Sequence, residues 1–177
     1  MNNTQKLSAL AALLLALTTF SACKKDEETA EENITTIEVH LTGTNFDKKF
    51  YWDDTDGDGV ANSIDEIQIP ANTGNIQAHL HVYDRSVTPE IDITEEIEEE
   101  SADHLFTYAV TGANLTIGSL NTDSANNPFG ITSVWTTAAA GSGSVNIKLY
   151  HEPTNKTNAT NPGGEVDFDV VFPVKIQ

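Results

Sequence analysis

Histidines at even spacing are the residues of this chain best suited to holding a metal ion. His79 and His81 fall on the same side of a stretch that alternates apolar and polar residues. Side chains two residues apart on a strand lie roughly 7 Å apart, which lets two imidazoles reach one borderline metal such as Zn²⁺, Cu²⁺ or Fe. The alternative is that both are ordinary surface histidines on the polar face of a strand.

Two further histidines extend the metal hypothesis. His104 comes four residues after Glu100, about one helical turn, so these side chains could share a ligand. His151 follows the end of another alternating stretch. We therefore predict a transition-metal site drawn from His79, His81, His104 and His151 with Glu100. The spacing alone leaves open whether the four histidines converge.

The sharpest local motif is the alternation DTDGDG at 54–59. Alternate carboxylates in a tight loop can converge on one hard cation, and Gly59 permits a sharp turn. The stretch resembles the thrombospondin type 3 repeat and the EF-hand loop, which implies Ca²⁺ held by five oxygen-bearing side chains: Asp54, Asp56, Asp58, Asn62 and Asp65. The alternative is a plain turn whose aspartates bond the local backbone.

Acidic residues dominate the charge of the 177-residue chain, with 27 Asp and Glu against 9 Lys and Arg and a net charge of -18. This balance excludes a nucleic-acid partner, because phosphate binding depends on Lys and Arg. Five glutamates cluster at Glu95, Glu96, Glu98, Glu99 and Glu100. They form a solvated helix face, a surface that gathers cations, or a docking surface for a basic partner.

Catalytic motifs are missing from the sequence. It has no serine in a nucleophile elbow, no glycine-rich phosphate loop and a single cysteine, Cys23. Paired acids are too numerous to indicate a hydrolase. We predict that the protein is not an enzyme.

Alternation of apolar and polar residues is the dominant pattern beyond residue 34. It runs through 37–41, 76–83, 145–150 and 166–176, where Val166 is expected to face the core with Phe168 and Val170. This period of two is typical of half-buried antiparallel strands. With turn residues between them, seven or eight short strands predict a β-sandwich over 34–177, immunoglobulin-like or jelly-roll-like.

One segment, 94–104, lacks this alternation and predicts a short helix. Its residues favour helix, its acids fall in the first turn, and Asp92 or Thr94 can cap it. Ile93 and Ile97 fall on one stripe. The helix is therefore expected across an open end or edge of the sandwich, with its glutamates outward.

The N-terminal residues predict export and lipidation. Lys6 precedes the apolar run 7–17, which is too short to span a bilayer, and small residues follow. We expect a signal peptide at 1–22 and an acidic tether at 23–33. Ser21-Ala22-Cys23 resembles a bacterial lipobox, which implies acylation of Cys23. The stretch 24–28 resembles the signal that sends Bacteroidetes lipoproteins to the outer face of the outer membrane.

From residue 34 onward the chain resembles a family of small lipoproteins of Flavobacteria and their relatives. The resemblance rests on five stretches: 34–42, 56–59, 91–97 leading to Asp103-His104, 151–153 and 163–167. Such proteins often carry the label of a type 1 periplasmic binding fold, which needs long helices that this sequence lacks. The resemblance implies that His104 and His151 belong to shared motifs, and that a TonB-dependent outer-membrane receptor is the partner.

These features lead to one preferred function and two alternatives. The preferred function is a lipid-anchored surface protein of the outer membrane that binds metal ions or a metal-containing ligand and delivers it to a TonB-dependent transporter. The first alternative is a non-enzymatic adhesion or accessory module with only structural calcium. The second is a glycan-binding sandwich that stacks sugars on Tyr51, Trp52 and Trp135.

Overall fold

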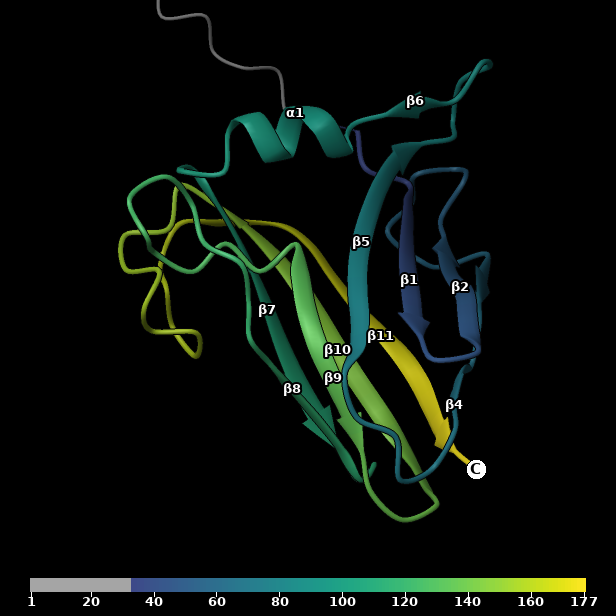
Figure 1. Ribbon diagram of the computed structural model, residues 1–177. Coiled ribbons are helices and arrows are strands. Elements are labelled where there is room, and N and C mark those ends of the chain that lie inside the picture. The colour runs from purple at the N-terminus through teal and green to yellow at the C-terminus, as the bar shows by residue number, and fades with distance from the viewer. Residues whose placement is uncertain (1–32) are drawn as a thin grey trace, which may run out of the picture. The chain divides into compact units, whose positions relative to one another are not determined.

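The computed structural model describes residues 33–177, so the expectations for the signal peptide, Cys23 and nearly all of the tether lie outside the described residues. Two sheets and one short helix make up this part of the chain (Figure 1). The predicted mainly β, sandwich-like fold is confirmed. Within 33–177, no helix is long and apolar enough to cross a membrane.

The first sheet has the strand order β3-β2-β1-β5-β9-β8, with β6 beside β5. Its strands are β1 (Thr36–Gly43), β2 (Phe46–Asp53), β3 (Ser63–Ile64), β5 (Ile76–Asp84), β6 (Ile91–Asp92), β8 (Leu115–Gly118) and β9 (Thr132–Thr137). All of its neighbouring strands are antiparallel. The middle of this sheet, where β1 lies between β2 and β5, carries the first candidate site.

The second sheet has the order β4-β11-β10-β7. Its strands are β4 (Ile67–Ile69), β7 (His104–Thr111), β10 (Gly141–His151) and β11 (Glu165–Ile176). Three strands run antiparallel, whereas β4 joins β11 in parallel. The described residues thus form eleven strands instead of the predicted seven or eight, because β3, β4 and β6 are pieces of two or three residues that alternation cannot reveal.

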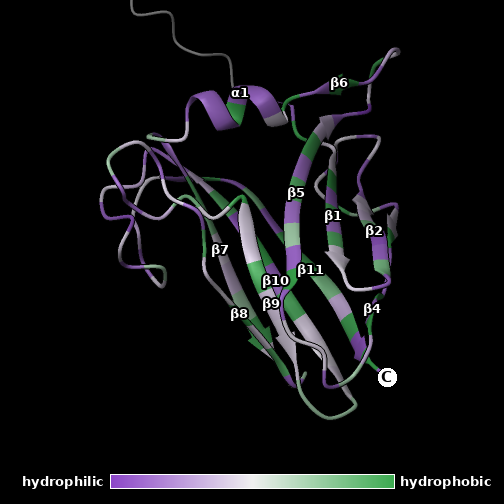
Figure 2. Cartoon of the chain, viewed as in Figure 1, coloured by the Kyte–Doolittle hydropathy of each residue, from purple (hydrophilic) through white to green (hydrophobic). Residues whose placement is uncertain are grey.

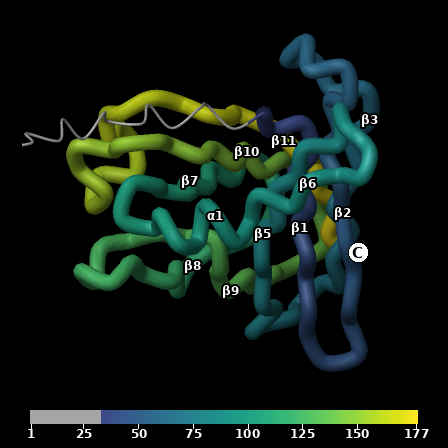
Figure 3. The backbone as a smooth tube through the Cα atoms, turned by 90° about the horizontal axis from the view of Figure 1, so that it is seen from above, coloured from purple at the N-terminus to yellow at the C-terminus, as the bar shows by residue number. Residues whose placement is uncertain are grey.

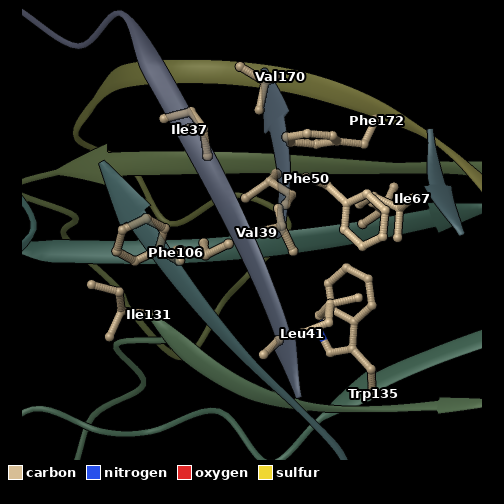
Figure 4. Close-up of a cluster of buried hydrophobic side chains, with 14 of the residues drawn as sticks. Ile37, Val39, Leu41, Phe50, Ile67, Phe106, Ile131, Trp135, Val170 and Phe172 are labelled. Atoms are coloured by element: carbon tan, nitrogen blue, oxygen red, sulfur yellow. The ribbon is translucent and has the colours of Figure 1, made fainter. Parts of the chain in front are cut away.

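Alternating burial builds the core between the sheets. Along β5, and along β11 from Phe168 onward, every second residue is buried, and Figure 2 shows apolar and polar residues alternating along β5. Figure 4 shows the packed side chains, with residues of both sheets in contact, among them Trp135, Phe106 and Phe172. Each of these three is fully buried. Burial of such surface stabilises the fold by about 25 cal/mol per Å² of apolar area.

The start of β11 departs from the prediction. Leu149 pairs with Phe168, whereas Tyr150 pairs with Val166, so one residue is skipped between them. This β-bulge places Asp167 as the extra residue and turns Val166 to solvent, where it is 48% exposed. The prediction that Val166 faces the core was therefore wrong.

The helix is shorter than predicted. It covers α1 (Thr94–Glu99) instead of 94–104, and His104 begins β7. The helix is capped at its C-terminal end by Glu100. Beyond it, the carbonyls of Ser101 and Ala102 accept hydrogen bonds from Lys156 Nζ at 2.6 and 3.4 Å. Tertiary contacts therefore override the local preference for helix.

The helix α1 starts at Thr94 as predicted, but the residue at its N-cap position is Ile93, without a side-chain cap hydrogen bond, instead of the predicted Asp92 or Thr94. Asp92 accepts a hydrogen bond from the Thr94 N–H at 2.9 Å, while Thr94 Oγ1 accepts one from the Val82 N–H at 3.0 Å. Ile97 is fully buried and anchors the helix on the core. Figure 1 shows α1 across one end of the strands, and Figure 3, which looks onto that end, shows it between β7 and β8. His79 contacts Glu98 of this helix, and His104 contacts the carbonyl of Glu100 directly after it.

Candidate metal sites

Three adjacent strands of the first sheet display polar side chains on the face away from the core. On β1, Glu38 pairs with Tyr51 of β2 and His81 of β5. The next outward residue, His40, pairs with Lys49 and His79 in the same way. Alternate residues of a strand share a face, so all of these side chains lie together. We call the group formed by Glu38, His40, His79 and His81 the His–Glu face.

The distances within the His–Glu face suit a metal ion. The ring centroids of His79 and His81 are 4.3 Å apart, and those of His40 and His81 are 6.4 Å apart. One potential ligand atom from each of Glu38, His40 and His81 lies within 4.8 Å of the others. Ligand atoms of a tetrahedral Zn²⁺ lie about 3.4 Å apart, so small rotamer changes would close the group on an ion.

Glu38 is the unusual member of this face. Its side chain lies on the outer side of the sheet, yet the residue is only 1% exposed. Lys49 Nζ forms an ion pair with Glu38 Oε1 at 2.9 Å. Burial raises the pKa of Glu38. The contacts with Lys49 and Tyr51 lower it by a larger amount, so the pKa of Glu38 lies below its ordinary value. Glu38 is therefore a buried carboxylate that stays charged at neutral pH.

Carboxylates orient two of the histidines. His40 Nε2 lies 2.8 Å from Asp47 Oδ1, and His79 Nε2 lies 3.2 Å from Glu98 Oε1 of α1. A carboxylate on one ring nitrogen fixes the ring and leaves the other nitrogen for a metal. Burial and the nearby His79 lower the pKa of His81, which favours the neutral imidazole that metals bind.

Two tyrosines and an arginine cover one side of the His–Glu face. The Arg85 guanidinium lies 5.1 Å from the ring centres of both Tyr51 and Tyr83, and it pairs with Glu90 and Asp53. Burial, reinforced by the charge of Glu38, raises the pKa of Tyr83 to about 12. Because Glu38 is buried, its charge interacts more strongly with these neighbours than it would in water.

A second group lies at one end of the second sheet. His104, the first residue of β7, pairs directly with His151, the last residue of β10, and their rings stack at 5.0 Å with a 17° interplanar angle. Asp167 joins them from the bulged start of β11, and potential ligand atoms of the three residues lie within 4.8 Å of one another. We call these residues the His–Asp group.

Glu100 contributes to the His–Asp group differently from the prediction. Its backbone carbonyl lies 3.2 Å from His104 Nδ1, whereas Asp167 supplies the carboxylate of the group. The structure also divides the four predicted histidines, with His79 and His81 on the first sheet and His104 and His151 on the second. His81 belongs to one group of potential ligands and His104 with His151 to another, whereas His79 belongs to neither and lies beside His81.

The aspartate loop gathers three of the five predicted calcium ligands. Potential ligand oxygens of Asp54, Asp56 and Asp58 lie within 4.8 Å of one another. Asp54 is 3% exposed and accepts the N–H groups of Gly57, Asp58 and Gly59 at 3.1, 3.3 and 2.7 Å. This carboxylate thus already organises the loop backbone, the arrangement expected of the plain turn.

The other two predicted calcium ligands hold neighbouring backbone. Asn62 Oδ1 accepts hydrogen bonds from the N–H and hydroxyl of Thr55, at 2.7 and 2.9 Å. Asp65 Oδ2 accepts the Tyr51 N–H at 2.9 Å. Calcium at this loop stays a prediction.

Sequence reasoning missed Glu38, His40 and Asp167. The first two had a signal, because Glu38 and His40 show the same two-residue spacing as His79 and His81. Asp167 had none, since its placement depends on the bulge. The alternative of sugar stacking does not fit Trp135, because this side chain is fully buried in the core. Tyr51 is also a poor platform, because the Arg85 guanidinium lies over its ring.

Comparisons with known proteins give no relative for this chain. No protein-family model, no curated protein and no solved structure matches it. The functional argument therefore rests on the two histidine groups and on the chemistry of their side chains.

Proposed function

We propose that the protein is a lipid-anchored protein of the outer-membrane surface that binds a divalent transition metal ion at the His–Glu face. The observation that supports this most strongly is the buried, charged Glu38 between histidines of two adjacent strands. Two imidazoles and one carboxylate, with His79 beside His81 as a further imidazole, are donors that Zn²⁺ and Cu²⁺ prefer. The anchor at Cys23 would hold this site at the membrane, where a TonB-dependent receptor could take up the ion.

Electrostatics supports capture of a cation. A net charge of -18 raises the concentration of cations near the surface, and Asp47 and Glu98 orient His40 and His79 from outside the group. In the metal-free state the Lys49 ammonium balances the charge of Glu38. Since the Lys49 side chain is 47% exposed, it can turn into solvent when an ion enters.

Metal stoichiometry tests the proposal. The purified protein is dialysed against Zn²⁺ or Cu²⁺ and its metal content measured by elemental analysis, together with a variant carrying His40→Ala and His81→Ala. Gln77→Ala is the matched control, because Gln77 lies on the same face of β5, two residues before His79. We expect the double variant to lose one equivalent and the control none. If the wild-type protein holds no transition metal, or if the double variant retains its full content, the proposal is wrong.

A further inference from the structure

Three strand ends of the second sheet meet where β7 begins, β10 ends and β11 begins. His104 is 1% exposed, His151 is half-buried and Asp167 is exposed, so the group runs from the interior to the surface. Two glycines in the connection from β10 to β11, Gly163 and Gly164, allow this connection to pass close to the end of β10. Gly164 adopts φ +80°, and a Cβ there would lie 2.2 Å from the His151 carbonyl oxygen.

We propose that His104, His151 and Asp167 form a second metal site, for an ion of the Zn²⁺ class, that is separate from the His–Glu face. Two imidazoles and a carboxylate are a ligand set that holds Zn²⁺ while leaving a fourth position open. The bulge at Asp167 brings this carboxylate to the pair of histidines.

Hydrogen bonding prepares His104 for this role. Its Nδ1 donates to the backbone carbonyl of Glu100 at 3.2 Å, which leaves Nε2 as the nitrogen with a lone pair. A backbone carbonyl on one ring nitrogen thus fixes the ring and its tautomer, an arrangement common among metal-binding histidines.

The exposed Asp167 gives this group access to solvent. Asp167 also lines a hollow of about 330 Å³ between the start of β11 and the aspartate loop, although neither histidine of the group lines it. A metal site needs such an entry path, and an open coordination position needs room for water or a ligand. An ion held here would also tie together the ends of β7, β10 and β11.

The test uses protein in which the His–Glu face is inactivated by His40→Gln and His81→Gln, so that its outcome does not depend on the first proposal. We expect this variant to bind one equivalent of Zn²⁺ in a calorimetric titration. Adding Asp167→Asn should weaken that binding at least about tenfold. Asp169→Asn is the matched control, since it removes the same charge from an exposed residue of the same strand and should change affinity less than about twofold.

Nuclear magnetic resonance of the imidazole nitrogens provides a second readout. On addition of Zn²⁺ we expect the Nε2 signal of His104 to shift while its Nδ1 keeps the proton. The proposal is overturned if the His40→Gln, His81→Gln protein binds no Zn²⁺, if Asp167→Asn and Asp169→Asn behave alike, or if the His104 signals do not move. If instead the first proposal is wrong, mutation of the His–Glu face will leave the number of bound metal ions per protein unchanged.

Discussion

A single buried carboxylate sets the chemistry of the His–Glu face. Glu38 is as buried as a core residue although it lies on the outer side of the sheet. Removing a carboxylate from water costs several kcal/mol, so its charge needs a partner of opposite sign. In the metal-free protein that partner is Lys49. A bound cation would take the place of Lys49 as the counter-charge and would offset the same cost of burying the Glu38 carboxylate.

Competition between Lys49 and a metal ion leads to a prediction. Lys49→Met should tighten Zn²⁺ binding at the His–Glu face by roughly tenfold, because the ion no longer displaces or faces an ammonium group. The same substitution should destabilise the metal-free protein, since it leaves Glu38 buried without its counter-charge. Calorimetric titration and thermal unfolding with and without Zn²⁺ measure the two effects.

Lys48→Met is the control for this prediction. It removes the same charge from the adjacent residue of β2, whose side chain lines a groove on the opposite face with Phe46 and Phe50. We expect no change in Zn²⁺ affinity beyond about twofold. Equal effects of Lys48→Met and Lys49→Met would show that overall charge, and not the pairing with Glu38, controls binding.

At the scale of elements, the strands were largely predictable and their pairing was not. Period-two alternation correctly placed His79 and His81 on one face of β5. It could not show that β5 pairs with β1 and so brings Glu38 beside His81, because this contact joins distant parts of the chain. Likewise, the bulge that exposes Val166 and positions Asp167 depends on pairing with β10, which local sequence does not encode.

The early end of α1 has the same kind of cause. The glutamate-rich stretch favours helix to residue 104. However, Lys156, from the connection between β10 and β11, donates hydrogen bonds to the carbonyls of Ser101 and Ala102. Its ammonium also contacts Asp123 Oδ2 at 2.8 Å, and the side chains of both residues are at most 7% exposed. One buried cation therefore joins three connecting segments, including the turn that leads to His104.

This buried pair predicts a large loss of stability on mutation. Lys156→Met should lower the free energy of unfolding by about 3–5 kcal/mol, because it leaves the buried Asp123 without its counter-charge. The exposed pair of Lys148 with Asp169, at 2.6 Å, is the control, and Lys148→Met should cost less than about 1 kcal/mol. Urea denaturation measures both, and similar losses for the two variants would contradict the importance of burial.

Taken as a whole, the molecule combines a strongly negative surface with a few carboxylates that the fold holds in the charged form. The hydrogen bond from Lys156, which outweighs burial, lowers the pKa of Asp123, with help from the N–H groups of Asn127 and Ala125. The Ser86 hydroxyl similarly lowers the pKa of Asp84. Acidification thus weakens repulsion among 27 acidic side chains, but it also removes these specific interactions.

The sign of the resulting pH dependence can be worked out for Asp123. Its folded-state pKa lies below the ordinary value of 3.8, so the folded protein binds this proton less readily than the unfolded chain does. The stability that Asp123 contributes is complete above about pH 4 and is lost as the pH falls through the lowered pKa. In metal-free protein, unfolding free energies should therefore fall steeply below pH 4.

Comparison of variants isolates this contribution from the general relief of repulsion. Asp123→Asn should remove up to one proton's share of the slope, about 1.4 kcal/mol per pH unit below pH 4. Glu95→Gln on the exposed face of α1 changes the net charge equally and should leave the slope unchanged. Urea denaturation from pH 2.5 to 7 in the presence of a chelator measures these slopes. Parallel curves for wild-type and Asp123→Asn protein would mean that acid acts through overall charge, because a pairing between Asp123 and Lys156 that stabilises the fold must make them diverge.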